Sequence, residues 1–248
     1  MINQIHNMDC LEGMKLLQDK SVDMILCDLP YGVTARNKWD VIIPFDKLWE
    51  QYERIIKDDG AIVLTATQPF ASKLIMSNPN LFRYDWIWEK TLATGHLNAK
   101  KMPMRAHESI LVFYKKLPTY NPIKTTGHTP VNSYTKHQDD GSNYGKTKIG
   151  ISGGGSTERY PRSVQRFSAD KQKEAMHPTQ KPVALFEYLI KTYTNEGETV
   201  LDNCMGSGTT AAAAVNTNRN FIGFEILEEY CAAANERINN MQRVLQVI

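Results

Sequence analysis

The sequence has few cysteines and no long apolar run. Its only cysteines are Cys10, Cys27, Cys204 and Cys231, which form neither a CxxC motif nor a Cys/His pair at metal-ligand spacing. They are typical of small buried residues in a reducing compartment, without disulfides or zinc. No stretch reaches the ~18–20 apolar residues that a membrane-spanning helix needs. Residues 1–10 lack the basic start and apolar core of a signal peptide, so a cytoplasmic protein without membrane contact is expected.

The sequence also lacks a strong excess of either charge, because 29 Lys and Arg nearly balance 27 Asp and Glu and leave a net charge of +2. The balance is uneven along the chain, since residues 115–175 hold 11 basic and 5 acidic side chains. Residues 117–175 are rich in Gly, Ser, Thr, Asn, Tyr and Lys and show little periodicity, which is typical of an inserted recognition loop. This stretch predicts a polyanionic partner, although a solvated loop with a chance excess of charge is the plain alternative.

The stretch Ser21–Gly32, SVDMILCDLPYG, joins a short apolar run to a polar turn. Such a run predicts a buried strand of a parallel sheet. In open α/β sheets ligands bind beyond the carboxyl ends of the strands. The carboxylate of Asp28, the rigid Pro30 and the ring of Tyr31 are therefore placed where chemistry is expected, although a plain strand followed by a turn has the same local pattern.

Strands and helices alternate over the rest of the chain, which favours an α/β fold with helices on both faces of a mostly parallel sheet. Helical spacing predicts a helix over Phe45–Ile56, and Gly60 is expected to cap its end. The clearest further strands are predicted at residues 61–67, 84–89, 109–114, 199–201 and 221–224.

A glycine-rich turn follows the strand at 199–201, in the sequence LDNCMGSGTT. Gly206 and Gly208 allow a ligand to approach the backbone closely, and the following helix offers free N–H groups. Glu225 ends the next strand, where it can accept hydrogen bonds from both ribose hydroxyls of a nucleoside. The loose pattern Gly-x-Gly-x-x-Ala also fits a dinucleotide site, so an NAD-dependent oxidoreductase remains an alternative.

Three motifs, DLPYG, HPTQKP and LDNCMGSGTT, together resemble the amino-methylating DNA methyltransferases that use S-adenosylmethionine. The catalytic motif precedes a basic insertion, which precedes the cofactor motif, as in the permuted β group. The resemblance spans nearly the whole chain. It implies a Rossmann-like methyltransferase fold with a seven-stranded sheet, a methyltransferase domain over 1–116 and 176–248, and a DNA target-recognition region over 117–175.

Carried over residue by residue, the resemblance implies a catalytic tetrapeptide and a set of cofactor contacts. The tetrapeptide is Asp28, Leu29, Pro30 and Tyr31. The cofactor contacts are Asp9, Cys10, Thr179, Lys181, Asp202, Met205, Gly206, Ser207, Gly208, Thr209 and Glu225. Among them, Asp9 matches the position that reaches adenine, and Thr179 and Lys181 match the segment that closes over the methionine moiety. A helix-capping threonine and a solvated lysine are the structural alternatives for those last two.

These groups suit transfer of a methyl group to an exocyclic amine. Asp28 and the carbonyl of Leu29 can each accept one N–H and aim the nitrogen lone pair at the methyl donor, while Tyr31 can stack on a base flipped out of the duplex. Leu29 stands where the commonest motif has proline, which is expected to be tolerated because only the carbonyl is needed. Carbon-5 methylation of cytosine needs an activated thiolate. This chemistry is rejected because none of the four cysteines follows a proline or has an obvious activating neighbour.

Within this class, Asp at the first tetrapeptide position resembles the adenine-N6 enzymes, and cytosine-N4 methylation is the alternative. The predicted partner is double-stranded DNA. Dimers are common among the enzymes that this chain resembles, and a cognate restriction endonuclease is a further partner that the resemblance allows. An inactive DNA-binding module and methylation of RNA or of a protein amide remain rivals.

Overall fold

The computed structural model describes residues 1–32, 40–136, 149–168 and 180–245 and divides the chain into two compact units. The first unit comprises Met1–Asn121 and Ser163–Ile248, and the second Pro122–Arg162. The second unit contains the antiparallel strands β6 (Tyr134–Thr135) and β7 (Ser152–Gly153). It is shorter than the predicted insertion over 117–175, because residues 164–167 form a strand of the first unit.

The central sheet has eight strands among the described residues, in the order β1-β10-β9-β2-β3-β5-β4-β8. Their bounds are β1 (Gln4–Asn7), β2 (Val22–Asp28), β3 (Ile56–Ala66), β4 (Phe82–Thr94), β5 (Arg105–Phe113), β8 (Val164–Phe167), β9 (Thr199–Asp202) and β10 (Asn220–Glu225). The first five in this order run parallel, whereas β5 is antiparallel to both β3 and β4. The expected count of seven strands is therefore wrong by one, and β8 is the strand that lies inside the predicted insertion.

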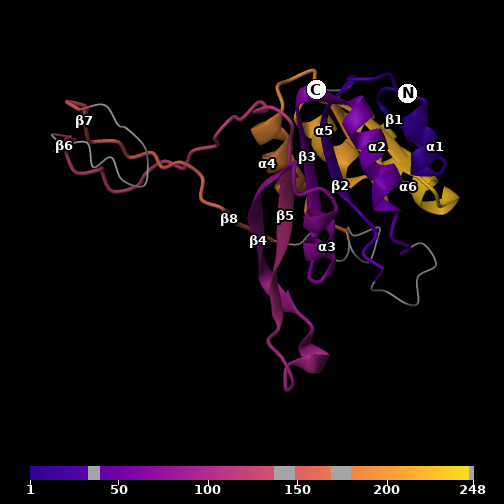
Figure 1. Ribbon diagram of the computed structural model, residues 1–248, viewed down its shortest axis with the longest axis horizontal. Helices are drawn as coiled ribbons and strands as arrows, with labels where there is room; N and C mark the ends of the chain where they lie inside the picture. Colours follow the sequence, from indigo (N-terminus) through magenta and orange to yellow (C-terminus); the bar gives the residue numbers. More distant parts are fainter. Residues whose placement is uncertain (33–39, 137–148, 169–179, 246–248) are drawn as a thin grey trace. The chain divides into compact units, whose positions relative to one another are not determined.

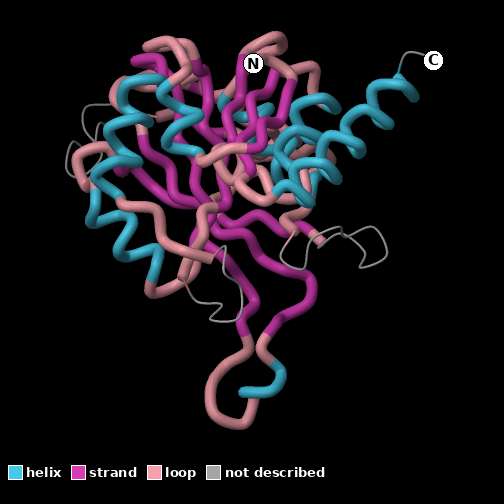
Figure 2. The backbone as a smooth tube through the Cα atoms, turned by 90° about the vertical axis from the view of Figure 1, so that its right-hand side faces the viewer, coloured by secondary structure: helices cyan, strands magenta, loops and turns pink. Residues whose placement is uncertain are grey.

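Helices cover both faces of the sheet, as predicted (Figure 2). The buried side chains of α4, α5 and α6 belong to one hydrophobic cluster, and those of α1, α2 and α3 to a second. The bounds are α1 (Cys10–Lys15), α2 (Phe45–Ile55), α3 (Phe70–Ser77), α4 (Val183–Tyr193), α5 (Thr209–Asn216) and α6 (Glu228–Leu245). Of the described helices, none is both long and apolar enough to cross a bilayer.

Strand β2 contributes to both clusters because it is buried on both faces. Met24 and Leu26 pack in the cluster with α4 and α5, whereas Ile25 and Cys27 pack in the cluster with α2. All four are fully buried. The unbroken apolar run therefore reflects a central strand between two helical layers.

Gly60 does not cap α2, because β3 begins at Ile56 directly after that helix and includes Gly60. A Cβ atom on Gly60 would lie 2.7 Å from the carbonyl oxygen of Asp23 and 2.7 Å from a side-chain carbon of Ile56. The glycine is thus required by the close approach of β2 and β3.

A hairpin formed by β4 and β5 extends beyond the helical layers, with the short helix η1 (His96–Asn98) near its tip (Figure 1, Figure 2). Exposed apolar side chains near the tip include Leu92, Leu97, Met102 and Met104. The hairpin end thus lies outside the core, while its base carries residues of the site described below.

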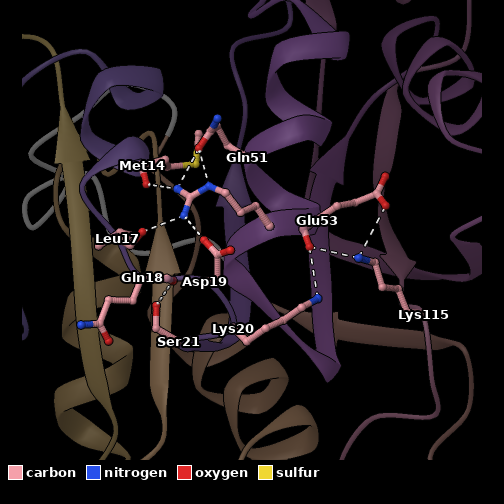
Figure 3. A network of polar contacts seen from close by, with 10 residues as sticks. Met14, Leu17, Gln18, Asp19, Lys20, Ser21, Gln51, Glu53 and Lys115 are labelled. Carbon is pink, nitrogen blue, oxygen red and sulfur yellow. Dashed lines mark hydrogen bonds and ion pairs between the residues drawn. The ribbon is translucent and has the colours of Figure 1, made fainter.

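The guanidinium group of Arg54, in the last turn of α2, contacts the segment that precedes β2. Figure 3 labels its partners Met14, Leu17, Asp19 and Gln51. This group donates hydrogen bonds to the carbonyl oxygens of Met14 at 2.7 Å and Leu17 at 2.8 Å. It also pairs with Asp19 at 2.6 Å and donates to Gln51 at 2.9 Å. One side chain therefore ties the end of α1, the following loop and α2 together just before β2 begins.

Replacing Arg54 with Met is expected to lower the free energy of unfolding by about 2–4 kcal/mol, because two part-buried carbonyl oxygens and Asp19 lose their charged donor. Urea unfolding measures the change. Lys47→Met, an exposed change on the same helix, is the control and is expected to have little effect. Equal urea midpoints for Arg54→Met and the control would contradict the bracing role.

Candidate active site

Four acidic residues predicted for the site lie at the same edge of the sheet. Asp28, Asp202 and Glu225 are the last residues of β2, β9 and β10. Asp9 follows β1, which pairs with β10 through Asn7 and Glu225. Because these strands are parallel neighbours, their carboxyl ends meet at one edge, and motifs far apart in the sequence come together there.

The Asp28 carboxylate accepts hydrogen bonds from three donors. Its Oδ1 accepts from the hydroxyl of Tyr31 at 2.6 Å and also from the hydroxyl of Thr65. Its Oδ2 accepts from the ammonium of Lys181 at 2.6 Å. These contacts fix the carboxylate in one orientation, with 26% of the side chain still exposed at the sheet edge.

Lys181 lies in a buried cluster of alternating charges. Its side chain is 7% exposed, so the alternative of a solvated lysine is wrong. The Nζ atom lies 3.4 Å from Oε2 of Glu108, whose Oε1 pairs with Lys90 at 2.6 Å. Burial by itself lowers the pKa of Lys181, but the carboxylates of Asp28 and Glu108 outweigh it and hold that pKa above its ordinary value.

The side chains of Tyr31 and Leu29 pack in different surroundings. The Tyr31 ring packs against Phe70, with centroids 5.0 Å apart, and Lys181 Nζ lies 5.6 Å from its centroid. Burial and the nearby Asp28 raise the Tyr31 pKa well above its ordinary value, so the hydroxyl stays a donor. The Leu29 side chain is 4% exposed and belongs to the cluster with α2 and α3, while Pro30 is half-buried. Leucine thus adds core packing where proline would add rigidity.

The glycine turn between β9 and α5 depends on two left-handed residues. Gly206 has φ +54° and Gly208 has φ +79°. A Cβ atom on Gly206 would meet nothing within 4 Å, so its backbone faces open space. On Gly208 it would lie 3.1 Å from Ala234, which reflects close packing against α6. The first glycine leaves room for a ligand and the second lets the turn pack on the protein.

Glu225 closes this turn by accepting backbone hydrogen bonds on both carboxylate oxygens. The donors are the N–H groups of Gly206 and Leu227, each at 2.8 Å. The neighbouring Asp202 accepts from the N–H of Cys204 at 2.9 Å and from the hydroxyl of Thr210. Both acidic residues therefore shape the turn, and an ionised carboxylate has further lone pairs for a ligand.

Burial raises the pKa of Asp202 from 3.8 to about 6. The folded protein therefore holds this proton more tightly than the unfolded chain, and the contribution of Asp202 to stability falls as the pH rises from about 4 to about 6. Asp202→Asn is expected to remove this dependence, so its stability relative to wild type rises by about 2–3 kcal/mol between pH ~4 and pH ~7.

Chemical unfolding across that pH range checks the change in slope. Asp46→Asn, at an exposed position in the first turn of α2, is the control for loss of one carboxylate. Parallel stability curves for wild type and Asp202→Asn would contradict the shifted pKa of Asp202.

The other predicted cofactor residues take varied places. Asp9 is the N-cap of α1 and accepts from the N–H groups of Leu11 and Glu12, while Cys10 begins that helix. Met205, Ser207 and Thr209 are buried in or beside the glycine turn. Their cofactor contacts remain predictions, and Thr179 lies outside the described residues.

The sequence did not predict four residues that support the site. Thr65 donates a hydrogen bond to Asp28. Glu108 faces Lys181 and pairs with Lys90. Tyr52 donates a 2.5 Å hydrogen bond to Asn203 in the glycine turn. Glu108 carried a weak signal, since it is a charged residue directly before the apolar run SILVF. Its partner Lys181 is more than seventy residues away in the sequence, so only the fold joins them.

All four cysteines are free thiols. Burial raises the pKa of Cys27 to about 12, so this thiol beside Asp28 stays neutral at physiological pH. A neutral thiol agrees with the rejection of carbon-5 cytosine chemistry. Among the described residues, no group of His, Cys, Asp and Glu is arranged as a metal site.

The sequence offers eight basic residues as candidate DNA contacts, and those that the structure describes are divided between the two units. The candidates are Lys115, Lys116, Lys124, Lys146, Lys148, Arg159, Arg162 and Arg166. Lys115 and Lys116, in the first unit, pair with Glu53 and Asp58. In the second unit, Lys124 pairs with Glu158, and Arg159 donates to backbone carbonyls. Of the others, Arg162 and Arg166 are described, whereas Lys146 and Lys148 lie outside the described residues.

Comparison with known proteins gives one consistent result. The sequence pattern of the DNA methylase family N6_N4_Mtase matches residues 22–236. The Type II methyltransferase M1.MboII of Moraxella bovis is 30% identical, over 97% of this chain and 98% of its own length. The DNA adenine methyltransferase YhdJ of Escherichia coli (strain K12) is 28% identical, over 93% of this chain and 81% of its own length.

Solved structures share the fold. An M1.HpyAVI-SAM complex matches with a TM-score of 0.65 at 24% identity, over 95% of this chain and 98% of that one. The PvuII DNA methyltransferase (cytosine-N4-specific) matches with a TM-score of 0.64 at 16% identity, over 98% of this chain and 92% of that one. The family pattern, which covers most of the sequence, is decisive: this chain belongs to the N6/N4 DNA methylase family.

Proposed function

We propose that this protein transfers a methyl group from S-adenosylmethionine to N6 of an adenine flipped out of duplex DNA. The supporting observation is that β2 and β9 are parallel neighbours, paired through Met24–Val200 and Ile25–Leu201. The catalytic tetrapeptide and the glycine turn therefore leave the same edge of the sheet. One site can hold a methyl donor and an acceptor base side by side.

The residues at the ends of β9 and β10 fit S-adenosylmethionine. Gly206 presents open backbone, and the Glu225 carboxylate, 8% exposed, has lone pairs left for the two ribose hydroxyls. In the proposed binding mode, the methionine end of the cofactor lies beside Asp202 and the N-terminus of α5. When bound, this cofactor supplies an electrophilic methyl group on its sulfonium sulfur.

The chain's own contribution is to bind and orient the amine. Asp28 and the Leu29 carbonyl accept its two N–H groups, which directs the nitrogen lone pair toward the methyl donor. Phe70 supports the Tyr31 ring, on which the base stacks for about 1–3 kcal/mol. Positioning of this kind can lower a barrier by ~7–11 kcal/mol in favourable cases.

Adenine is the proposed base because the tetrapeptide begins with Asp, as in the adenine enzymes that the sequence resembles. One relative, YhdJ of Escherichia coli, is named as a DNA adenine methyltransferase. Cytosine N4 is the second candidate, since the family contains both activities. The proposed site of DNA contact is the basic insertion, where cationic side chains bind phosphates and read base edges.

Methylation of plasmid DNA by the purified protein, followed by single-molecule sequencing, tests the proposal. N6-methyladenine at a recurring sequence is the expected result, and N4-methylcytosine would replace the base assignment. Calorimetry should show binding of S-adenosylmethionine and no binding of NADH. Cofactor binding without any DNA methylation would indicate the inactive DNA-binding module or a non-DNA substrate instead.

A further inference from the structure

Both oxygens of the Asp28 carboxylate already accept hydrogen bonds. Oδ1 of Asp28 already accepts two hydroxyl hydrogen bonds, and Oδ2 accepts the ammonium of Lys181 at 2.6 Å. A target amine must add a fourth donor to this carboxylate, which has about four acceptor positions. Oδ2 is the less occupied oxygen, so the amine and Lys181 would share it, and each donor would weaken the hydrogen bond of the other.

Glu108 offers Lys181 a second acceptor at short range. Its Oε2 lies 3.4 Å from Nζ, within ion-pair distance but outside hydrogen-bond geometry. Among the described residues this buried oxygen has no hydrogen-bond partner. An unbonded carboxylate oxygen that is buried and faces a cation is costly, and a small movement of Nζ would satisfy it.

Lys90 keeps that acceptor in place. Its Nζ pairs with the other oxygen of Glu108 at 2.6 Å and lies 5.1 Å from the Trp88 ring centroid. The side chains of Lys90 and Glu108 are 14% and 9% exposed. The Glu108 carboxylate is therefore anchored at one oxygen, while the other stays directed at Lys181.

We propose that Glu108 is a positioning residue that takes over the ammonium of Lys181 when the target amine binds Asp28. The exchange needs a change from 3.4 Å to hydrogen-bond distance on one side and loss of the 2.6 Å contact on the other. It frees Oδ2 and leaves Asp28 as a stronger acceptor. The inference rests on the proposed catalytic role of Asp28.

A double-mutant cycle tests this coupling. Glu108→Gln keeps the side-chain shape but removes the anionic acceptor, so kcat is expected to fall about tenfold, with the Kd for S-adenosylmethionine and for DNA changed less than about twofold. In a Lys181→Met background, Glu108→Gln is expected to change kcat less than about twofold, because Glu108 acts through the lysine. Equal effects in both backgrounds would overturn the proposal.

The pH profile gives a second readout that a structural role would not move. The charged groups facing Lys181 are Asp28 and Glu108. The Tyr31 ring centroid lies 5.6 Å from its Nζ, and Lys90 pairs with Oε1 of Glu108. Removing one carboxylate lowers the pKa of the ammonium. Loss of the ammonium proton ends its competition for Oδ2 of Asp28, so the kcat deficit of Glu108→Gln should shrink at alkaline pH. A deficit that does not change with pH would also overturn the proposal.

Two further variants complete the design. Glu108→Asp keeps the charge and is expected to recover part of the lost kcat. Glu89→Gln, an exposed change on the neighbouring strand β4, is the matched control and should behave as wild type. Absence of DNA methylation by the wild type would refute the proposed function, and full activity in Asp28→Ala would refute the catalytic role of Asp28 on which this inference rests. Loss of activity in Asp28→Ala without Glu108–Lys181 coupling would refute only this inference.

Discussion

Replacing Asp28 with Ala is expected to lower kcat at least about a thousandfold, while the Kd for S-adenosylmethionine changes only a few-fold. The amine loses one of its two acceptors, and removing a single preorganised hydrogen-bonding group from an active site costs about 10²–10³ in rate. Here the same change also releases Lys181, Thr65 and Tyr31, which all donate to this carboxylate. The orientation of the whole pocket is therefore lost with the acceptor.

Single-turnover methylation of duplex DNA separates this effect from DNA binding. Asp46→Ala, an exposed carboxylate in α2, controls for the change in charge. A thermal melt checks that Asp28→Ala is folded. The variant is expected to fold because Lys181 keeps Glu108 as a partner. Turnover within tenfold of wild type would sink the catalytic assignment of Asp28.

The second large effect is expected for Glu225→Ala, which should weaken S-adenosylmethionine binding about a hundredfold. Hydrogen bonds to a charged group contribute about 1.5–3 kcal/mol each, and each 1.4 kcal/mol is a tenfold change in Kd. The variant also removes the acceptor for the Gly206 N–H, so the turn is less fixed. In contrast with Asp28→Ala, the loss should be largest in Kd and smaller in kcat at saturating cofactor.

Calorimetry with S-adenosylmethionine and with S-adenosylhomocysteine measures the effect and should give the same loss for both, because the ribose is common to them. Glu229→Ala removes an exposed carboxylate in the first turn of α6 and is the matched control. Unchanged cofactor affinity in Glu225→Ala would refute the ribose role.

Most of the fold was predictable because its strands are short apolar runs between helices with clear periodicity. The run Val22–Cys27 could be identified as a doubly buried strand, and the structure confirms it. The error at Gly60 arose because a glycine after a helix is usually a cap, whereas here the need is close packing of β2 on β3. Strand β8 was missed because Val164–Phe167 is a short edge strand of alternating exposure.

The arrangement of the candidate site was predictable only where its residues lie in contiguous motifs. Asp28, Gly206 and Glu225 lie in or just after strands, and strand ends meet whenever the strands are parallel neighbours. The pair Glu108–Lys181 was not predictable, because β5 runs antiparallel and brings its starting end to the site. Burial of these opposite charges depends on packing from three separate segments, which no local pattern records.

The strand order also affects how the chain folds while it is being synthesised. Strand β2 at Val22–Asp28 pairs with β3 soon after it is made, but its other neighbour, β9, is Thr199–Asp202. At ribosomal rates of about 5–20 residues per second, β2 waits about 10–30 s with one edge unpaired. An unpaired apolar edge is prone to aggregation. Nascent chains of this protein should therefore bind chaperones until β9 emerges and completes both the core and the candidate active site.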